Sequence, residues 1–251
     1  MPDFRVFCEP PSLEPAEIQL NPAESHHLVQ VCRARPGDTV VALDGRGNEW
    51  ISTLTDSAKS GSVLKVTQHL RQKPLSYSIA LGQALPKGKS MDSIVRKATE
   101  IGVRQIIPLE SERTEVHVAG DREEHKKEKW LSIAIEAAKQ CGNPFLPEVL
   151  AVQRAAAFME SAKGYDLKLI ASLHPGAVSL RNVLAEYRQE HGSLPRNVLW
   201  LIGPEGDFTP AEISLSQTHG FRPIGLGPLV LRCETAAIVA LSILSYELQN
   251  P

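Results

Sequence analysis

The chain has 251 residues, 42% of them hydrophobic and 22% charged, which is the composition of an ordinary folded protein with room for one large and one small domain. The net charge of −2 argues against nucleic-acid binding through overall positive charge, and the four cysteines are too widely spaced for a disulfide framework or a metal cluster. Because no apolar run is long enough to cross a membrane and the N-terminus lacks a secretory signal, we expect a cytoplasmic protein without a metal.

The first part of the chain, up to about Arg71, consists of short alternating segments separated by turn residues. This pattern predicts a small β-barrel or sandwich. One short helix interrupts it, because Asn21, Pro22 and Glu24 form an N-cap, a proline at the first helical position and a capping-box acid. Lys73-Pro74 then breaks the pattern, so we predict one domain over residues 1–72 and a second over residues 73–251.

From Ser76 onward, apolar runs alternate with amphipathic segments. Strands and helices that take turns indicate βαβ units around a mostly parallel sheet, and hence an α/β domain. The predicted strands cover residues 77–85, 105–109, 147–152, 167–173, 197–203 and 221–226. The predicted helices cover residues 90–101, 121–141, 154–163 and 179–190, with one more from Pro210 and a final one at the C-terminus.

A first glycine loop, GQALPKGKS at residues 82–90, nearly matches the phosphate-binding loop of nucleoside triphosphatases. That motif requires glycine at the position of Gln83, so Gly82 is one residue out of register. Residues 86–104 carry five basic and two acidic side chains. A phosphate-binding patch and a solvated helix face both remain open interpretations of this charge.

A second glycine loop, GPEG at residues 203–206, precedes a helix that begins with the capping box Thr209-Pro210-Ala211-Glu212. Its glycines allow the backbone to approach a ligand, while Glu205 would repel a phosphate. That chemistry suits a nucleoside or a positively charged ligand. The alternative is a tight turn that only requires glycine.

The C-terminal segment, residues 224–244, contains a third loop followed by Arg232, Glu234 and a helix that is apolar on almost every face. Such a helix must be buried. Arg232 lies at the helix N-terminus, where the helix dipole disfavours a cation, so it either pairs with an acid such as Glu234 or serves an electron-rich substrate group. The segment LIASLHPG, residues 169–176, is a further strand end, and ligands of parallel sheets bind at such ends.

The stretches GPEGDFTPAEI (203–213) and LGPLVLRCETA (226–236) make the chain resemble the RsmE family, the 16S ribosomal RNA uridine-N3 methyltransferases of the SPOUT class. The resemblance extends over essentially the whole chain. Residues 26–50 are similar to the family's N-terminal RNA-binding, PUA-like barrel, and residues 97–103, 111–116 and 134–142 are similar to its recurrent motifs. Asp207, Pro228, Cys233 and the pair Asn143-Pro144 depart from the family's pattern.

The resemblance implies a PUA-like domain followed by a trefoil-knotted α/β domain that forms a homodimer and binds S-adenosylmethionine. It implies that Arg232 and Glu234 are catalytic. It places the cofactor on Ser172, Leu173, Gly203, Glu205, Gly206, Leu226, Gly227 and Leu231. It suggests substrate RNA contacts by Arg5, Arg33, Lys97 and Arg113.

The function implied by the resemblance is S-adenosylmethionine-dependent methylation of uridine N3 in the 16S ribosomal RNA of the small subunit. Three alternatives stay open at this point. The chain could be a SPOUT enzyme that methylates the ribose 2'-oxygen. It could bind RNA without catalysis. It could also be a nucleoside triphosphatase that uses the first glycine loop.

Overall fold

The computed structural model describes residues 4–10, 12–116 and 121–249, and its contacts group the chain into two compact units. The first unit comprises residues 1–74 together with 135–146, and the second comprises residues 75–134 and 147–251. The final turns of one long helix thus belong to the first unit. The division into domains over 1–72 and 73–251 stays a prediction.

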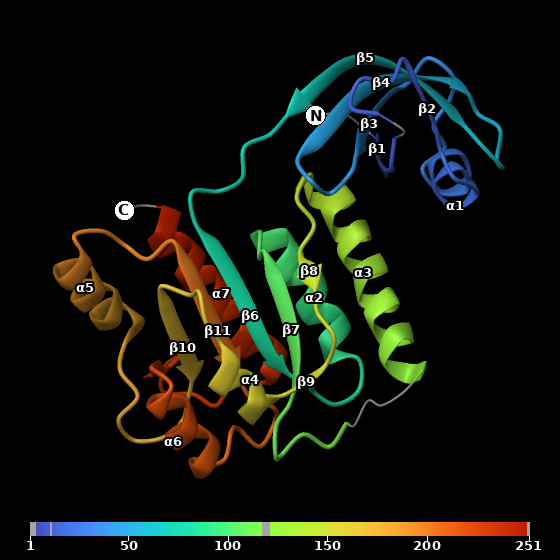
Figure 1. The fold of residues 1–251 in the computed structure, drawn as a ribbon. Coiled ribbons are helices and arrows are strands. Elements are labelled where there is room, and N and C mark those ends of the chain that lie inside the picture. Colours follow the sequence, from blue (N-terminus) through green and yellow to red (C-terminus); the bar gives the residue numbers. More distant parts are fainter. Residues whose placement is uncertain (1–3, 11, 117–120, 250–251) are drawn as a thin grey trace. The chain divides into compact units, whose positions relative to one another are not determined.

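The first unit is a curled five-stranded sheet with a short helix (Figure 1). The strands follow the order β1-β3-β4-β5-β2, with β1 and β3 parallel and the other pairs antiparallel. The elements are β1 (Phe4–Phe7), β2 (Glu17–Gln19), α1 (Pro22–His26), β3 (Thr39–Leu43), β4 (Asn48–Asp56) and β5 (Val63–Arg71). Alternate residues of β4 point inward, where Trp50 and Leu54 are fully buried in the core, as the period of a half-buried strand requires. The predicted small β-domain is therefore confirmed.

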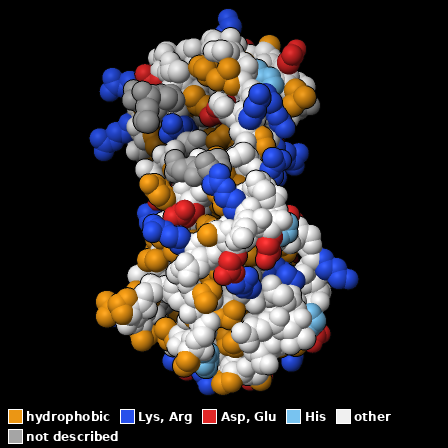
Figure 2. Space-filling model, turned by 90° about the vertical axis from the view of Figure 1, so that its left-hand side faces the viewer, with side chains coloured by type: hydrophobic (Ala, Val, Ile, Leu, Met, Phe, Trp, Pro, Cys, Tyr) orange, Lys and Arg blue, Asp and Glu red, His pale blue; other side chains and the backbone are white. Residues whose placement is uncertain are grey.

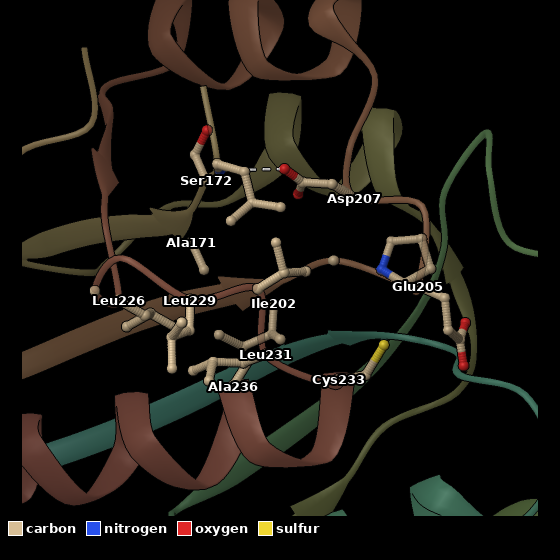
Figure 3. Close-up of a pocket in the computed structure, with 15 residues that line it drawn as sticks. Ala171, Ser172, Ile202, Glu205, Asp207, Leu226, Leu229, Leu231, Cys233 and Ala236 are labelled. Atoms are coloured by element: carbon tan, nitrogen blue, oxygen red, sulfur yellow. Dashed lines mark hydrogen bonds between the residues drawn. The ribbon is translucent and has the colours of Figure 1, made fainter. Parts of the chain in front are cut away.

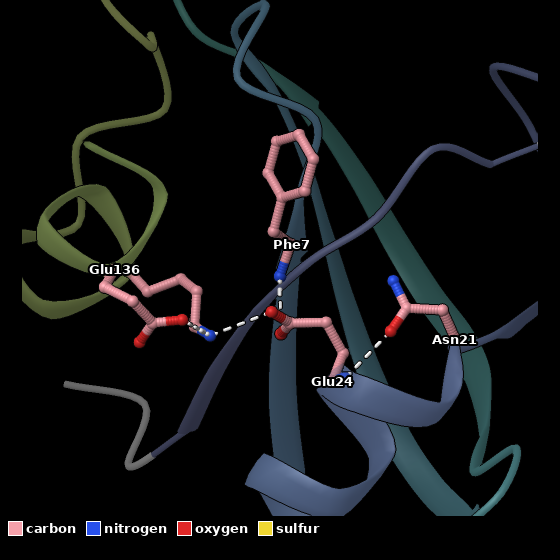
Figure 4. A network of polar contacts seen from close by, with 5 residues as sticks. Phe7, Asn21, Glu24 and Glu136 are labelled. Carbon is pink, nitrogen blue, oxygen red and sulfur yellow. Dashed lines mark hydrogen bonds and ion pairs between the residues drawn. The ribbon is translucent and has the colours of Figure 1, made fainter. Parts of the chain in front are cut away.

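Helix α1 begins as predicted, because the Asn21 side chain accepts a hydrogen bond from the Glu24 backbone N–H at 2.8 Å. The chain continues from α1 as a π-helical turn over His27–Val31. The predicted capping-box role of the Glu24 carboxylate is wrong. One of its oxygens accepts the Phe7 N–H at 3.1 Å, and the other pairs with Lys139 at 2.9 Å (Figure 4).

Lys139 is the buried cation of the first unit. Its side chain is 5% exposed and also contacts Glu136 at 2.7 Å, while the side chain of Glu24 is 12% exposed. Through this pair the C-terminal turns of the long helix are fixed to α1 and β1 within the first unit. A buried charge of this kind is stable only while it keeps its partner.

The second unit is a parallel sheet in the order β12-β10-β11-β6-β7-β8, with β9 also paired to β7. The strands are β6 (Ser78–Ala84), β7 (Gln105–Glu110), β8 (Glu148–Val149), β9 (Gln153–Arg154), β10 (Leu167–Ala171), β11 (Asn197–Ile202) and β12 (Phe221–Ile224). The helices are α2 (Ser90–Ile101), α3 (Asp121–Cys141), α4 (Ala155–Ser161), α5 (Leu180–His191), α6 (Pro210–Thr218) and α7 (Cys233–Gln249). The predicted α/β alternation is confirmed, whereas the knot stays a prediction.

Helices cover both faces of this sheet (Figure 1). The helices α4 and α6 pack with β10 and β11 in one core cluster, and α7 packs beside α2 against β6 and β11. Strands buried on both faces read as continuous apolar runs, as β11 does. Among the described helices, none has the length and apolar character needed to cross a membrane.

The expectation that α7 is buried on all sides is wrong for the single chain. One side of the helix packs on the sheet and on α2, but Ile243 and Tyr246 remain 38% and 68% exposed. Part of the apolar surface of α7 therefore stays exposed in the single chain.

We predict that Lys139→Ala lowers the free energy of unfolding by about 3 to 5 kcal/mol, because it leaves the Glu24 carboxylate buried without its cation. Denaturant unfolding followed by circular dichroism measures this. Arg222→Ala is the matched control, since its ion pair with Glu186 is exposed and worth about 1 kcal/mol or less. Equal losses in the two variants would contradict the prediction.

Candidate functional site

A pocket in the second unit lies where three loops meet at the carboxyl ends of β10, β11 and β12 (Figure 3). These strands are parallel neighbours, so their ends lie along one edge of the sheet, where open α/β sheets bind ligands. The space between the three loops, open solvent included, is about 550 Å³. It is lined by Ala171, Ser172, Leu173, Ile202, Gly203, Pro204, Glu205, Asp207, Leu226, Gly227, Leu229, Val230, Leu231, Cys233 and Ala236.

Seven of the eight residues predicted to bind a cofactor line this pocket, and Gly206 is the exception. Gly206 lies on the same loop but faces Arg113, whose Nη1 donates a 2.6 Å hydrogen bond to the Gly206 carbonyl. A Cβ at Gly206 would come within 3.2 Å of the Arg113 side chain. The structure thus brings the three predicted loops together and gives Gly206 a packing role.

The glycines of the pocket let backbone form its walls. A Cβ on Gly203 would lie 3.0 Å from an oxygen of Asp207 and 3.2 Å from the Phe208 nitrogen, so the loop folds too tightly for a side chain there. Gly227 adopts φ of +116°, a conformation that favours glycine. Gly203 thus allows the loop to fold tightly on itself, while the space beside Gly227 is open.

Asp207 is a pocket residue that the sequence analysis did not select. It has φ of 59°, and one carboxylate oxygen accepts the Leu173 N–H at 3.2 Å while the other accepts the Phe208 N–H at 2.8 Å. Asp207 therefore joins the loop after β11 to the loop after β10. The available signal was an acid directly after a glycine turn, at a position where Asp tolerates a left-handed backbone.

The charge of the pocket is negative. Glu205 and Asp207 are its acidic lining residues, and the residues that line it include no lysine or arginine. Burial, followed by the charges of Glu205 and Glu234, raises the pKa of the Cys233 thiol to about 12, so this thiol stays protonated at neutral pH. Glu205 is directed away from the other labelled residues in Figure 3, and its Oε1 accepts the Lys87 N–H at 2.9 Å.

The two residues predicted to be catalytic flank the pocket without lining it. Arg232 directly precedes α7, and its carbonyl accepts the Ala236 N–H at 2.8 Å. Its side chain is exposed, and within the described part of the chain it forms no ion pair, with Glu234 or any other acid. The alternative that Arg232 serves to pair with an acid such as Glu234 is therefore not supported by the described residues.

The four predicted RNA contacts do not form one cluster within a unit, because Arg5 and Arg33 belong to the first and Lys97 and Arg113 to the second. Arg5 donates to the Lys139 carbonyl at 3.4 Å, and Lys97 pairs with Glu100 at 2.8 Å. Arg33 is exposed and has φ of 62°, which is unusual for a long side chain.

The first glycine loop has a different explanation from phosphate binding. Gly82 lies inside β6, where a Cβ would come within 2.3 Å of the Leu201 side chain, and Gln83 is fully buried beside it. The glycine thus serves sheet packing. The described residues also contain no group of three or more metal-ligating side chains.

Two family models together match most of the chain. The model for the RNA methyltransferase domain matches residues 72–245, and that for the RNA methyltransferase PUA domain matches residues 20–67. The ribosomal RNA small subunit methyltransferase E of Synechocystis sp. is 32% identical over 98% of this chain and 78% of its own length. The protein of that name from Bacillus subtilis is 32% identical over 89% of this chain and 88% of its own length.

Solved structures give the same picture. A putative methyltransferase from Legionella pneumophila, in complex with the cofactor SAM, has a TM-score of 0.85 at 33% identity over 97% of both chains. A ribosomal RNA small subunit methyltransferase E from Neisseria gonorrhoeae, bound to S-adenosyl methionine, has a TM-score of 0.84 at 26% identity over 97% of both chains. With its PUA-like and α/β units and its strand-end pocket, the chain belongs to the ribosomal RNA small subunit methyltransferase E family of RNA methyltransferases.

Proposed function

We propose that this protein transfers a methyl group from S-adenosylmethionine to N3 of a uridine in the 16S ribosomal RNA of the small subunit. The observation that carries the proposal is the pocket formed by three strand-end loops, with acidic lining residues and, at its edge, an arginine that forms no ion pair with the described residues. The relatives named above supply the substrate class.

The residues of the pocket fit S-adenosylmethionine. The cofactor supplies a methyl group on a positively charged sulfur, and the negative lining favours such a charge. The tight backbone around Gly203 and Gly227 accommodates a flat adenine ring, while apolar side chains such as Leu226 and Leu231 cover its faces. The ligand roles of the seven predicted lining residues, and of Gly206, are part of the proposal.

Arg232 and Glu234 provide the chemistry at the uracil ring. The N3 proton is flanked by two carbonyls, and its removal develops negative charge on their oxygens. The guanidinium of Arg232, which is exposed, stabilises that charge, since a positioned cation acts most strongly where charge develops. Glu234 either accepts the proton or orients Arg232, and the variants described below separate these two roles.

RNA binding uses basic side chains of both units. Figure 2 shows several lysine and arginine side chains on the drawn face of the first unit, with fewer acidic ones. Arg33 is the strongest candidate there, because it is exposed and forms no hydrogen bond or ion pair within the described residues, and its unusual backbone suggests a functional constraint. Lys97 and Arg113 contribute from the second unit, and Arg5 also stabilises the end of α3.

A homodimer is part of the proposal. The exposed apolar side of α7, with Ile243 and Tyr246, needs a cover that the single chain does not supply. A second copy provides a matching apolar surface by symmetry. A cytoplasmic location follows for an enzyme that acts on ribosomal RNA.

We predict that Arg232→Ala lowers kcat by about 100-fold or more and leaves the Kd of S-adenosylmethionine within about twofold, because Arg232 does not line the pocket. Transfer of labelled methyl groups to small ribosomal subunits measures kcat, and calorimetry measures Kd. Glu234→Gln removes the acidic limb of the pH–rate profile if Glu234 accepts the proton, because a base is active only when deprotonated, and lowers kcat without changing the shape of the profile if Glu234 orients Arg232. Full turnover by Arg232→Ala would refute the catalytic assignment, with Arg222→Ala as the control.

The role of Arg33 is tested by the salt dependence of RNA binding. We predict that Arg33→Ala weakens binding to 16S ribosomal RNA and reduces the slope of log K against log salt by about one. Filter binding at several salt concentrations measures the slope. An unchanged slope, with Arg222→Ala also unchanged, would remove Arg33 from the RNA interface.

The dimer is tested by mass. Light scattering should give about twice the mass of one chain, 27.5 kDa, because a second copy covers the apolar side of α7. Tyr246→Glu should shift the protein towards the monomer, since it would bury an unpaired charge. A wild-type protein of single-chain mass would contradict the prediction.

A further inference from the structure

Asp207 has a left-handed backbone conformation, which is uncommon for residues other than glycine although Asp tolerates it better than most. Among the described residues with side chains, only Arg33 and Asp207 have positive φ, and Asp207 lies in the pocket wall. A left-handed conformation is unfavourable for a residue with a Cβ, so it persists where other interactions hold it. The loop after β11 is therefore fixed at this residue by its surroundings.

The carboxylate of Asp207 provides the interactions that hold it. It accepts N–H groups from Phe208 at 2.8 Å and from Leu173 at 3.2 Å, and Figure 3 shows it directed towards the loop that carries Ser172. Gly203 packs beneath it, where a Cβ would lie 3.0 Å from its oxygen. One side chain thus ties together two of the three loops that form the pocket.

The same carboxylate contributes negative charge to the pocket wall. Of the acidic lining residues, Glu205 is directed outward and accepts the Lys87 N–H, whereas Asp207 is directed along the wall. The lining residues include no lysine or arginine that would neutralise it. Its charge also acts on the Cys233 thiol, whose pKa is raised by burial first, then by the charges of Glu205 and Glu234, and last by that of Asp207.

We propose that Asp207 positions the pocket and makes it select a positively charged ligand over its neutral counterpart. Resting on the proposed function, this means that the pocket prefers S-adenosylmethionine, with its sulfonium, to the product S-adenosylhomocysteine, with its neutral thioether. In the reaction the carbon–sulfur bond breaks, the carbon–nitrogen bond to N3 forms, sulfur keeps the electron pair, and the N3 proton leaves to a base. The product therefore loses its attraction to Asp207, which favours its release.

The positioning role and the charge can be separated by three variants. Asp207→Asn keeps a residue that tolerates positive φ and one acceptor oxygen but removes the charge. Asp207→Gly removes the strain of the positive φ, and it removes both the charge and the hydrogen bond to the Leu173 N–H. Glu160→Gln, on the exposed side of α4 and outside the pocket, is the matched control for loss of one negative charge.

The measurement is the Kd of each ligand by calorimetry for the four proteins. The two ligands share all groups except the methyl group and its positive charge. A shift of the pocket loops therefore weakens the binding of both ligands equally. The ratio of their Kd values then reports only the effect of the charge. We expect Asp207→Asn to reduce the preference for S-adenosylmethionine by about fivefold or more. We expect Asp207→Gly to weaken S-adenosylhomocysteine as well, and Glu160→Gln to leave both values unchanged.

Thermal unfolding of each variant verifies that it is folded before its Kd is interpreted. If the wild-type protein binds both ligands and Asp207→Asn keeps their ratio within about twofold, the inference about Asp207 is wrong while the proposed function stands. If the wild-type protein binds neither ligand, the proposed cofactor is wrong, and the inference falls with it. Equal loss of both ligands in Asp207→Asn would leave Asp207 a positioning residue alone and would overturn the selection by charge.

Discussion

The parallel pairing of β12, β10 and β11 is the constraint on which the site depends. Parallel strands end on one edge of a sheet, so the loops that follow these three neighbours must meet, although they lie far apart in the sequence. No single loop has enough polar groups to bind a nucleoside. The pocket exists because the sheet gathers glycine backbone, apolar side chains and a carboxylate at one place.

Acidic and basic side chains occupy different parts of this site. The pocket carries acidic residues and no basic ones, which suits a cationic donor, whereas the basic groups lie outside it, where they can meet RNA. Arg232 is at the border, at the start of a helix whose dipole does not stabilise it. In the proposed reaction, negative charge that develops on the substrate would give this cation the counterpart that the described acidic residues do not provide.

Local features were predictable from the sequence because they depend on neighbouring residues. The caps at Asn21 and Thr209 mark the starts of their helices correctly, and continuous apolar runs identify buried strands such as β11. Features that join distant segments were not predictable. Glu24 looks like a capping-box acid until Lys139 is brought beside it, and Gly82 looks like part of a phosphate loop until Leu201 is placed against it. Asp207 was identifiable only as a departure from the family's pattern, because its partner, the Leu173 N–H, comes from another strand end.

The account depends most on the identity of the methylated atom, since the chemistry assigned to Arg232 requires an acidic ring nitrogen between two carbonyls. The decisive measurement is mass spectrometry of nucleosides from small ribosomal subunits that lack the modification, after incubation with this protein and S-adenosylmethionine. The account predicts one new 3-methyluridine in 16S ribosomal RNA. A methyl group on a ribose 2'-oxygen, or no transfer at all, would contradict it.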